Sequence, residues 1–177
     1  KSNGNAENGE AAALHTPTLI ICPTSVLANW RHEITRFAPT LRVMIHHGNN
    51  RLGTVGFAQA VREHDVIITS FGTARRDIEM LQRWTWSHLI LDEAQNIKNP
   101  GAKQSQAVRA IDARRRIALT GTPVENNTFD LYSQMDFLNP GLLGSQDFFR
   151  TEFATPIDKY RDENAARSLR KLIYPFI

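Results

Sequence analysis

The sequence predicts an α/β protein in which a parallel sheet is flanked by helices. Short apolar runs of strand length alternate along the chain with longer segments whose apolar residues recur at helical spacing. Strands that alternate with helices form parallel units with right-handed crossovers. The 177 residues suffice for one such unit with a buried core. In sheets of this kind, ligands bind outside the carboxyl ends of the strands.

The apolar runs predict five strands. The run TLIIC at 18–22 is continuous, which is typical of a strand buried on both faces. The other strands are expected at 41–48 (LRVMIHHG), 65–70 (DVIITS), 88–93 (HLILDE) and 115–122 (RRIALTGT). The basic run 114–116 stands at the amino end of the last strand, and we expect it to be a solvated turn away from any ligand.

Helices are expected between the strands and after the last one. In the segment 25–38, apolar residues at helical spacing, Trp30 among them, stop before Pro39 and mark a helix whose apolar face packs on the core. The other helices are expected at 55–64, 73–84, 102–112, 127–138, 145–153 and 163–177. The chain therefore divides into a flexible linker (1–16), an α/β unit (17–128) and a helical extension (129–177).

Composition and charge limit the class of protein. Hydrophobic residues make up 41% and charged residues 22%, as in soluble globular proteins. The net charge of +3 permits nucleic-acid binding without requiring it. The single cysteine, Cys22, excludes an intrachain disulfide, suits a reducing compartment and is expected to be an inert core residue. No apolar run approaches the length of about 18 residues that a membrane span needs, and the polar first residues predict no signal peptide.

Polar residues gather where the strands end. These ends are Pro23-Thr24-Ser25, His47-Gly48, Thr69-Ser70, Asp92-Glu93 and Thr120-Gly121-Thr122-Pro123. Turns and helix caps explain most of them, but two adjacent acids repel each other, so Asp92 and Glu93 need another reason. An acid at the tip of an apolar strand holds Mg²⁺ in P-loop nucleotide hydrolases, and a second acid can take a proton from the attacking water.

Six motifs in order carry a resemblance to a known family. They read PTSVLANWRHEITRFAP, HHGNNR, DVIITSFGTARRD, LDEAQNIKNP, ALTGTPVENN and DLYSQMDFLNPGLLG. LDEAQ and ALTGTP are similar to the acidic and third motifs of superfamily-two helicases. The set as a whole, spread over residues 18–177, resembles the Swi/Snf-type DNA-dependent ATPases. This family includes chromatin remodellers and DNA translocases. The residues of the motifs are more similar to those of its bacterial members.

The resemblance implies a RecA-like first motor lobe that uses ATP and Mg²⁺ and moves on double-stranded DNA of any sequence. Asp92 would bind Mg²⁺ through water, and Glu93 would deprotonate the water that attacks the γ-phosphate. Gln95 would couple the nucleotide state to DNA movement through Thr120, Gly121 and Thr122. The residues expected to face DNA phosphates are Thr24, Ser25, Arg51, Thr69 and Ser70.

The sequence departs from the family pattern in three ways. It contains no G-x-x-x-x-G-K-[ST] loop, which in the family lies upstream and cradles the phosphates. It also contains no second RecA-like lobe with its arginine finger, so we expect a fragment of the first lobe that is inactive alone. The acidic motif ends in Gln95 where many helicases have His, and Gln does not titrate near neutral pH. A cytoplasmic protein is expected, at the nucleoid in bacteria or in the nucleus in eukaryotes.

Two alternatives remain open beside this reading. The first is another superfamily-two motor, such as an RNA helicase or a restriction translocase, against which VLANW and FLNPGLLG argue. The second is a protein or DNA docking module without ATPase activity, against which the intact acids argue. His46 and His47 adjoin no second cluster of ligands, so a zinc site is not expected. Trp30 is expected to be a core residue and not a base-stacking platform.

Overall fold

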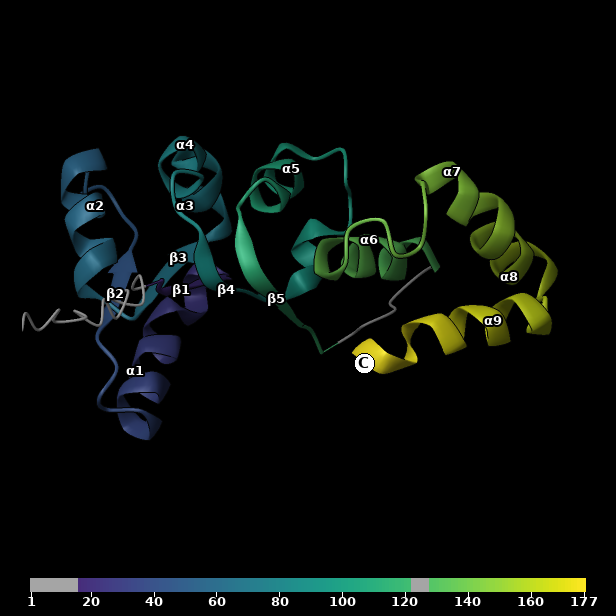
Figure 1. Ribbon diagram of the computed structural model, residues 1–177, viewed down its shortest axis with the longest axis horizontal. Helices are drawn as coiled ribbons and strands as arrows, with labels where there is room; N and C mark the ends of the chain where they lie inside the picture. Colours follow the sequence, from purple (N-terminus) through teal and green to yellow (C-terminus); the bar gives the residue numbers. More distant parts are fainter. Residues whose placement is uncertain (1–15, 122–127) are drawn as a thin grey trace, which may run out of the picture.

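The computed structural model describes residues 16–121 and 128–177, and a sheet of five parallel strands forms its centre (Figure 1). The strands are β1 (Thr18–Cys22), β2 (Val43–His46), β3 (Val66–Ser70), β4 (Trp86–Asp92) and β5 (Ala113–Leu119), arranged in the order β2-β3-β1-β4-β5. All the pairings are parallel, which confirms the predicted fold class. The carboxyl ends of the strands consequently meet at one edge of the sheet.

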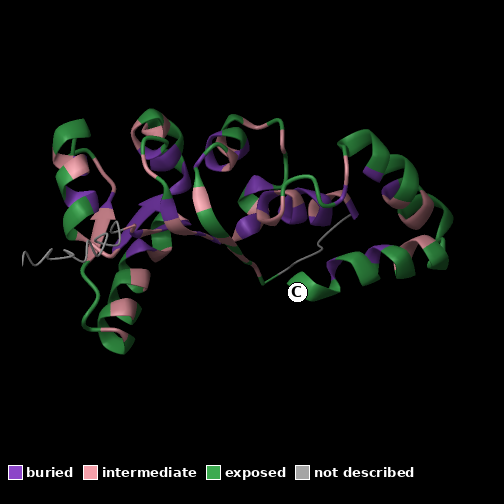
Figure 2. Cartoon of the chain, in the orientation of Figure 1, coloured by how far each residue is buried: buried purple, intermediate pink, exposed green. Residues whose placement is uncertain are grey.

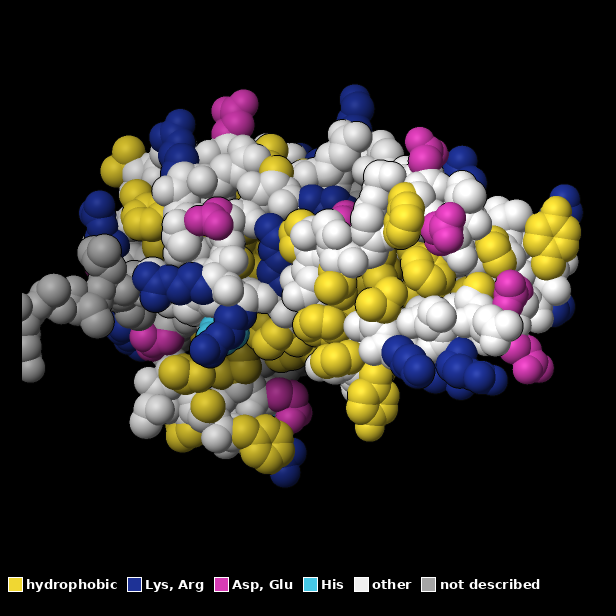
Figure 3. Space-filling view, turned by 45° about the vertical axis from the view of Figure 1, so that its right-hand side comes forward, with side chains coloured by type: hydrophobic (Ala, Val, Ile, Leu, Met, Phe, Trp, Pro, Cys, Tyr) yellow, Lys and Arg dark blue, Asp and Glu magenta, His cyan; other side chains and the backbone are white. Residues whose placement is uncertain are grey.

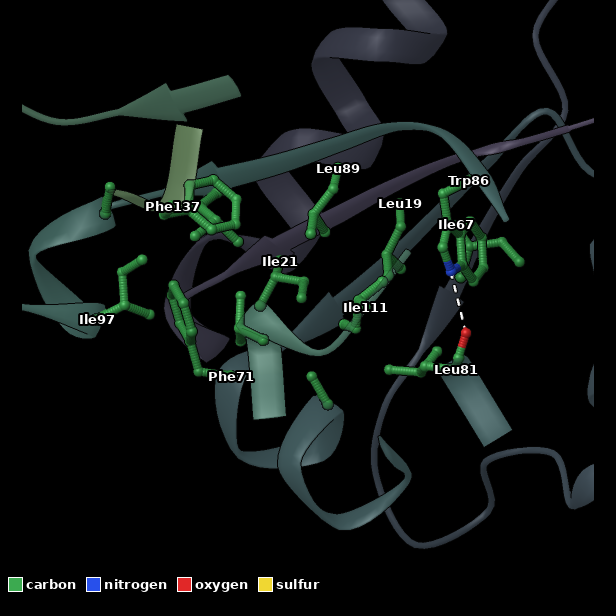
Figure 4. Close-up of a cluster of buried hydrophobic side chains, with 14 of the residues drawn as sticks. Leu19, Ile21, Ile67, Phe71, Leu81, Trp86, Leu89, Ile97, Ile111 and Phe137 are labelled. Carbon is green, nitrogen blue, oxygen red and sulfur yellow. Dashed lines mark hydrogen bonds between the residues drawn. The ribbon is translucent and has the colours of Figure 1, made fainter. Parts of the chain in front are cut away.

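Helices cover both faces of the sheet and complete a three-layer structure (Figure 1). One face carries α1 (Leu27–Phe37), and the other carries α2 (Thr54–Glu63), α3 (Phe71–Arg76), α4 (Ile78–Leu81) and α5 (Lys103–Arg109). Side chains of β1 alternate between the two faces, as the pleat of a strand requires. Leu19 and Ile21 belong to the main core beneath α2 to α5 (Figure 4), whereas Ile20 and Cys22 pack with α1.

The structure confirms the prediction that Cys22 is a core residue. Its side chain is fully buried at the end of β1. Burial, together with the nearby charge of Asp92, raises the pKa of the Cys22 thiol to about 12. A thiol with so high a pKa carries almost no reactive thiolate at neutral pH.

The predicted helix over 73–84 is broken in the structure at Asp77. The chain forms α3 and α4 with Asp77 between them, in a non-helical conformation (φ −105°, ψ 22°). The Asp77 carboxylate is held there by the side chains of His46 and Arg51, at 2.9 and 2.6 Å. The helix that the apolar spacing predicts is therefore interrupted at the residue whose carboxylate binds these two side chains.

The C-terminal helices form a second core beside the sheet. They are α6 (Thr128–Leu138), α7 (Gln146–Phe149), α8 (Thr155–Tyr160) and α9 (Glu163–Ile173), with a π-helical stretch at Arg150–Ala154. Eight buried side chains, from Leu131 to Ile173, make up this second core. The helices of this tail are mostly exposed on their outer faces (Figure 2). In the described ranges, no helix is long and apolar enough to cross a membrane.

Helix α6 belongs to both cores. Phe137 is fully buried in the main core, while Leu131 and Met135 are buried in the second. The predicted division at residue 128 therefore separates α6 from β5, although Phe137 packs in the core of the sheet. The division of the chain into domains stays a prediction.

Two arginines, one from β5 and one from α5, hold α6 against the rest of the structure. The guanidinium of Arg116 donates to the carbonyl oxygens of Phe137, Arg109 and Ile111 at 3.1 to 3.3 Å and lies 5.3 Å from the Phe137 ring centroid. Arg109 pairs with Asp136 at 2.7 Å. The prediction of a turn at 114–116 is therefore wrong, because the run lies within β5. Arg114 and Arg115 are exposed, as expected, whereas Arg116 is half-buried and donates to one carbonyl group of α6 and to two at the end of α5 and just after it.

We expect Arg116→Ala to lower the free energy of unfolding by about 1 to 3 kcal/mol, because three carbonyl groups lose a charged donor. Urea unfolding followed by circular dichroism measures the change. The matched control is Arg115→Ala, since Arg115 is the exposed neighbour in the same strand; its effect should stay within about 0.5 kcal/mol. Equal effects of the two substitutions would contradict the role given to Arg116.

Candidate active site

The paired acids stand at the end of β4, next to the end of β5. Asp92 is the last residue of β4 and is in register with Leu119, the last residue of β5. Thr120 and Gly121 follow directly, so the third motif lies beside the acidic motif, as the parallel sheet requires. Thr122, which the sequence also assigns to this site, lies outside the described residues.

Both oxygens of the Asp92 carboxylate accept a hydrogen bond. Oδ1 accepts from the backbone N–H of Glu93 at 3.0 Å. Oδ2 accepts from the indole N–H of Trp30 at 2.8 Å, across 62 residues of sequence. Asp92 is half-buried, and each oxygen keeps a second lone pair for another partner. The Trp30 contact could not be predicted, because the helical spacing of Trp30 indicates only a core residue.

Glu93 has an unusual backbone conformation. Its φ of 55° and ψ of 57° lie in the left-handed region, which residues with a side chain seldom occupy. This conformation ends β4 and begins the short 3-10 helix η2 (Ala94–Ile97). Strained residues of this kind cluster at functional sites, at a cost of about 1 to 3 kcal/mol. The turn leaves Glu93 half-buried and directed toward Gln95.

A chain of hydrogen bonds joins the acid to the third motif. The amide group of Gln95 donates to Oε2 of Glu93 at 2.6 Å. The hydroxyl group of Thr120 donates to the Oε1 atom of Gln95 at 3.0 Å. Gln95 can occupy this middle place because its side chain both donates and accepts. The coupling role of Gln95, Thr120 and Gly121 stays a prediction, and the structure gives it a physical connection.

A cavity of about 510 Å³ opens beside these residues. Its polar wall contains Asp92, Glu93, Thr120 and Gly121. Its apolar wall comes from α6 and from Phe176 and Ile177 near the end of α9. Hydrophobic side chains also gather on the surface between the sheet and the helical tail (Figure 3). Acidic and hydrogen-bonding groups therefore line one side of a space large enough for a small ligand.

The residues present fit a magnesium ion that is shared with a bound phosphate. Within the described ranges, no three His, Cys, Asp or Glu side chains gather into a metal cluster. Mg²⁺ usually keeps several waters and is bound by one or two carboxylates together with substrate phosphates, so it needs no such cluster. Asp92, with one free lone pair on each oxygen, can supply the one protein carboxylate. Its role as a metal ligand stays a prediction.

The strand ends predicted to face DNA differ in exposure. Thr24 and Ser25 lie exposed in the 3-10 helix η1 (Thr24–Val26) before α1. Thr69 is fully buried, and its hydroxyl group donates to the carbonyl oxygen of His46 at 2.7 Å. Ser70 is also buried and caps α3 by accepting the backbone N–H of Thr73 at 3.2 Å. Contact with DNA stays a prediction for all four residues, and the Thr69 hydroxyl would have to leave its buried position to make it.

Arg51 is held by a cluster around Asp77. Its Nε and Nη2 atoms donate to the two carboxylate oxygens of Asp77 at 2.6 and 2.9 Å. Nη1 donates to the carbonyl oxygen of Gly48 at 3.1 Å. His46 contributes a third contact to Asp77, at 2.9 Å through Nε2. The motif HHGNNR is thereby joined to the α3–α4 break, and a phosphate contact by Arg51 stays a prediction.

The environment of His46 in this cluster disfavours a charged imidazole. Its side chain is 1% exposed, and burial lowers the pKa of the imidazole although Asp77 accepts a hydrogen bond from it. Arg51 already neutralises Asp77 and lowers the pKa of that carboxyl group. The Nδ1 atom of His46 is buried and, in the described part of the chain, has no hydrogen-bond partner, so a second proton there would go unsatisfied.

Comparison with known proteins identifies the fold and the family. The fold is that of a RecA-like ATPase lobe: the Sulfolobus solfataricus SWI2/SNF2 ATPase core in complex with dsDNA matches with a TM-score of 0.82 and 45% identity, over 93% of this chain and 34% of that one. The chain belongs to the SNF2-related domain family, whose model matches residues 3–177.

Relatives in other organisms are much longer than this chain. YwqA of Bacillus subtilis (strain 168), whose name describes an ATP-dependent helicase/translocase, is 46% identical over 168 residues, which are 95% of this chain and 18% of that protein. The TATA-binding protein-associated factor MOT1 of Saccharomyces cerevisiae is 36% identical over 172 residues, with 91% of this chain and 9% of MOT1 covered. The chain thus spans less than a fifth of either relative.

We expect the stability of the protein to fall as the pH drops from 7 to 5. The unfolded chain binds a proton at His46 near the ordinary pKa of 6.5, whereas burial lowers the pKa of this imidazole in the folded protein, so acid favours unfolding. One group contributes at most about 1.4 kcal/mol per pH unit.

Urea unfolding at several pH values measures this dependence in the wild type and in His46→Gln, which keeps an N–H donor for Asp77. The variant should show a shallower fall. His32→Gln, at an exposed position on α1, is the control. An unchanged slope in His46→Gln would show that His46 is not the group responsible.

Proposed function

We propose that this chain works as the first motor lobe of an ATP-driven translocase or remodeller of double-stranded DNA. The observation that carries the proposal is the hydrogen-bond chain from Glu93 through Gln95 to Thr120, beside Asp92 at the carboxyl edge of the sheet. Membership of the SNF2-related domain family and the likeness to an ATPase core bound to dsDNA support it. A second RecA-like lobe of the same protein would complete the site.

The two acids have different roles in the proposed reaction. Asp92 would hold Mg²⁺ through water, and a bound ion would supply positive charge that offsets the negative charge on the phosphates of ATP. Glu93 accepts the proton of the water that attacks the γ-phosphate. Gln95 donates to Oε2 of Glu93, which orients the carboxylate and leaves Oε1 available for that water.

The same contact gives the site a means of coupling. Any shift of Thr120 pulls on Gln95, and Gln95 in turn reorients the Glu93 carboxylate. Movement of Thr120 and the orientation of the Glu93 carboxylate are therefore coupled, and each affects the other. A motor needs such a linkage, since hydrolysis without movement along DNA would be wasted. Such a protein works at the nucleoid of a bacterial or archaeal cell or in the nucleus of a eukaryotic one.

In the complete motor protein, we expect Glu93→Gln to bind ATP normally and to lose hydrolysis. Removal of a catalytic base lowers the rate by about 10²- to 10⁴-fold. Nucleotide affinity and turnover are measured separately, and Glu152→Gln, at an exposed position on the helical tail, is the control. Near-normal turnover in Glu93→Gln would remove Glu93 from the role of base, whereas a wild-type protein without any turnover would argue for the docking-module alternative.

DNA binding should depend on the exposed strand end. In the complete protein, replacing Thr24 and Ser25 together by Ala should weaken binding of duplex DNA by about 30-fold, since each of the two hydrogen bonds contributes about 1 kcal/mol. Hydroxyl groups displace no counterions, so the salt dependence, about 0.9 per neutralised phosphate, should not change.

Titrations with duplexes of unrelated sequence, at several salt concentrations, measure both quantities. Thr69→Val is the comparison at the buried strand end, and it should lower thermal stability because the His46 carbonyl loses its donor. A clear preference for one sequence or for RNA would contradict the proposal. Unchanged DNA affinity in the double variant would remove Thr24 and Ser25 from the interface.

A further inference from the structure

Trp30 contributes one of the two hydrogen bonds that the structure gives to the Asp92 carboxylate. The N–H···O distance of 2.8 Å is in the range of about 2.7 to 2.9 Å that is typical of hydrogen bonds to a charged oxygen, which are about twice as strong as neutral ones. The other bond comes from the neighbouring backbone N–H of Glu93. Trp30 is therefore the side chain that fixes the orientation of Asp92 from a distant part of the sequence.

The indole ring itself is held in place by the core. It packs against the cluster beneath α1, which contains Ile20, Cys22 and Leu27. The apolar body of the ring is thus fixed while the polar tip reaches the acid, an arrangement that suits the amphipathic character of Trp. The indole nitrogen can only donate a hydrogen bond, so it always presents a donor to the Asp92 carboxylate.

The position of Trp30 in α1 connects the acid to the exposed strand end. Thr24 and Ser25 form η1, and α1 follows from Leu27 without a break in the chain. Trp30 lies one turn into this helix. A displacement of η1 on DNA would move α1, and α1 would move the donor that holds Asp92.

We propose that Trp30 is a positioning residue, which orients the metal-binding carboxylate of Asp92 and links it to the strand end that meets DNA. This inference rests on the proposed function. Partners of a metal-binding carboxylate are known to matter: their loss typically weakens metal affinity or activity by about 10- to 100-fold. Trp30→Phe removes the N–H donor and keeps an aromatic ring in the core.

The contact is tested first without any measurement of activity. The complete protein is labelled with 5-fluorotryptophan, and the fluorine resonance of Trp30 is assigned from its absence in Trp30→Phe. Asp92→Asn should shift this resonance and leave that of Trp86 in place, because the indole of Trp86 donates to the carbonyl oxygen of Leu81 instead (Figure 4). Mn²⁺ added with ADP should broaden the Trp30 resonance more than the Trp86 resonance. A Trp30 resonance that responds to neither change would overturn the inference.

The second test separates positioning from folding. In the complete protein, Trp30→Phe should need about 10- to 100-fold more Mg²⁺ for half-maximal ATPase activity, with nucleotide binding in the absence of Mg²⁺ unchanged. Trp86→Phe also loses an indole hydrogen bond, but away from the site, and should keep the wild-type requirement for Mg²⁺. Thermal melting shows that both variants fold.

The outcomes distinguish this inference from the function on which it rests. A wild-type Mg²⁺ requirement in folded Trp30→Phe would overturn the positioning role, even if Glu93→Gln abolishes hydrolysis and the proposed function holds. A complete wild-type protein that does not hydrolyse ATP in the presence of duplex DNA would instead overturn the proposed function itself. If Trp30→Phe does not fold, the spectra decide without that assignment: a tryptophan resonance that both shifts in Asp92→Asn and is broadened by Mn²⁺ with ADP supports the contact, and the absence of such a resonance overturns it.

Discussion

The parallel pairing of β1 with β3 on one side and β4 on the other is the constraint on which the rest of the structure depends. Residues from very different parts of the sequence reach the same edge of the sheet only because these strands run in one direction. Cys22 lies opposite Ser70 in this register, and Ile21 lies opposite Leu91, one residue before Asp92. The exposed end of β1 and the acid at the end of β4 are therefore neighbours before any side chain makes a contact.

Much of this arrangement could be predicted from the sequence. Continuous apolar runs mark buried parallel strands, and acids directly after such a run mark the edge where ligands bind. These signals are local, and they placed Asp92, Glu93 and Thr120 at one edge. The apolar pattern does not predict whether a single polar side chain is exposed to water or hydrogen-bonded within the protein. Whether an arginine is solvated, as at Arg115, or buried against carbonyl groups, as at Arg116, depends on which helix packs above it.

Contacts between side chains that are far apart in the sequence could not be predicted, for the same reason. The helical spacing of Trp30 is equally compatible with a simple core residue and with one whose N–H reaches an acid 62 residues away. The break at Asp77 was missed because the sequence around it favours a helix, while the two partners of its carboxylate come from β2 and the loop that follows it. Thr69 shows the same limit, since its place at a strand end predicts a contact with DNA but does not indicate that its hydroxyl group is buried against the His46 carbonyl oxygen.

The membership of α6 in two cores has a consequence for any attempt to dissect this protein. A shortened version that ends before Thr128 would lose Phe137 from the middle of the main core and leave Arg116 without the carbonyl group it binds there. A tail expressed without the sheet would expose the same aromatic ring to water. Protein engineers who wish to move this lobe into another context must therefore carry α6 with it, whichever side of the chain they want to keep.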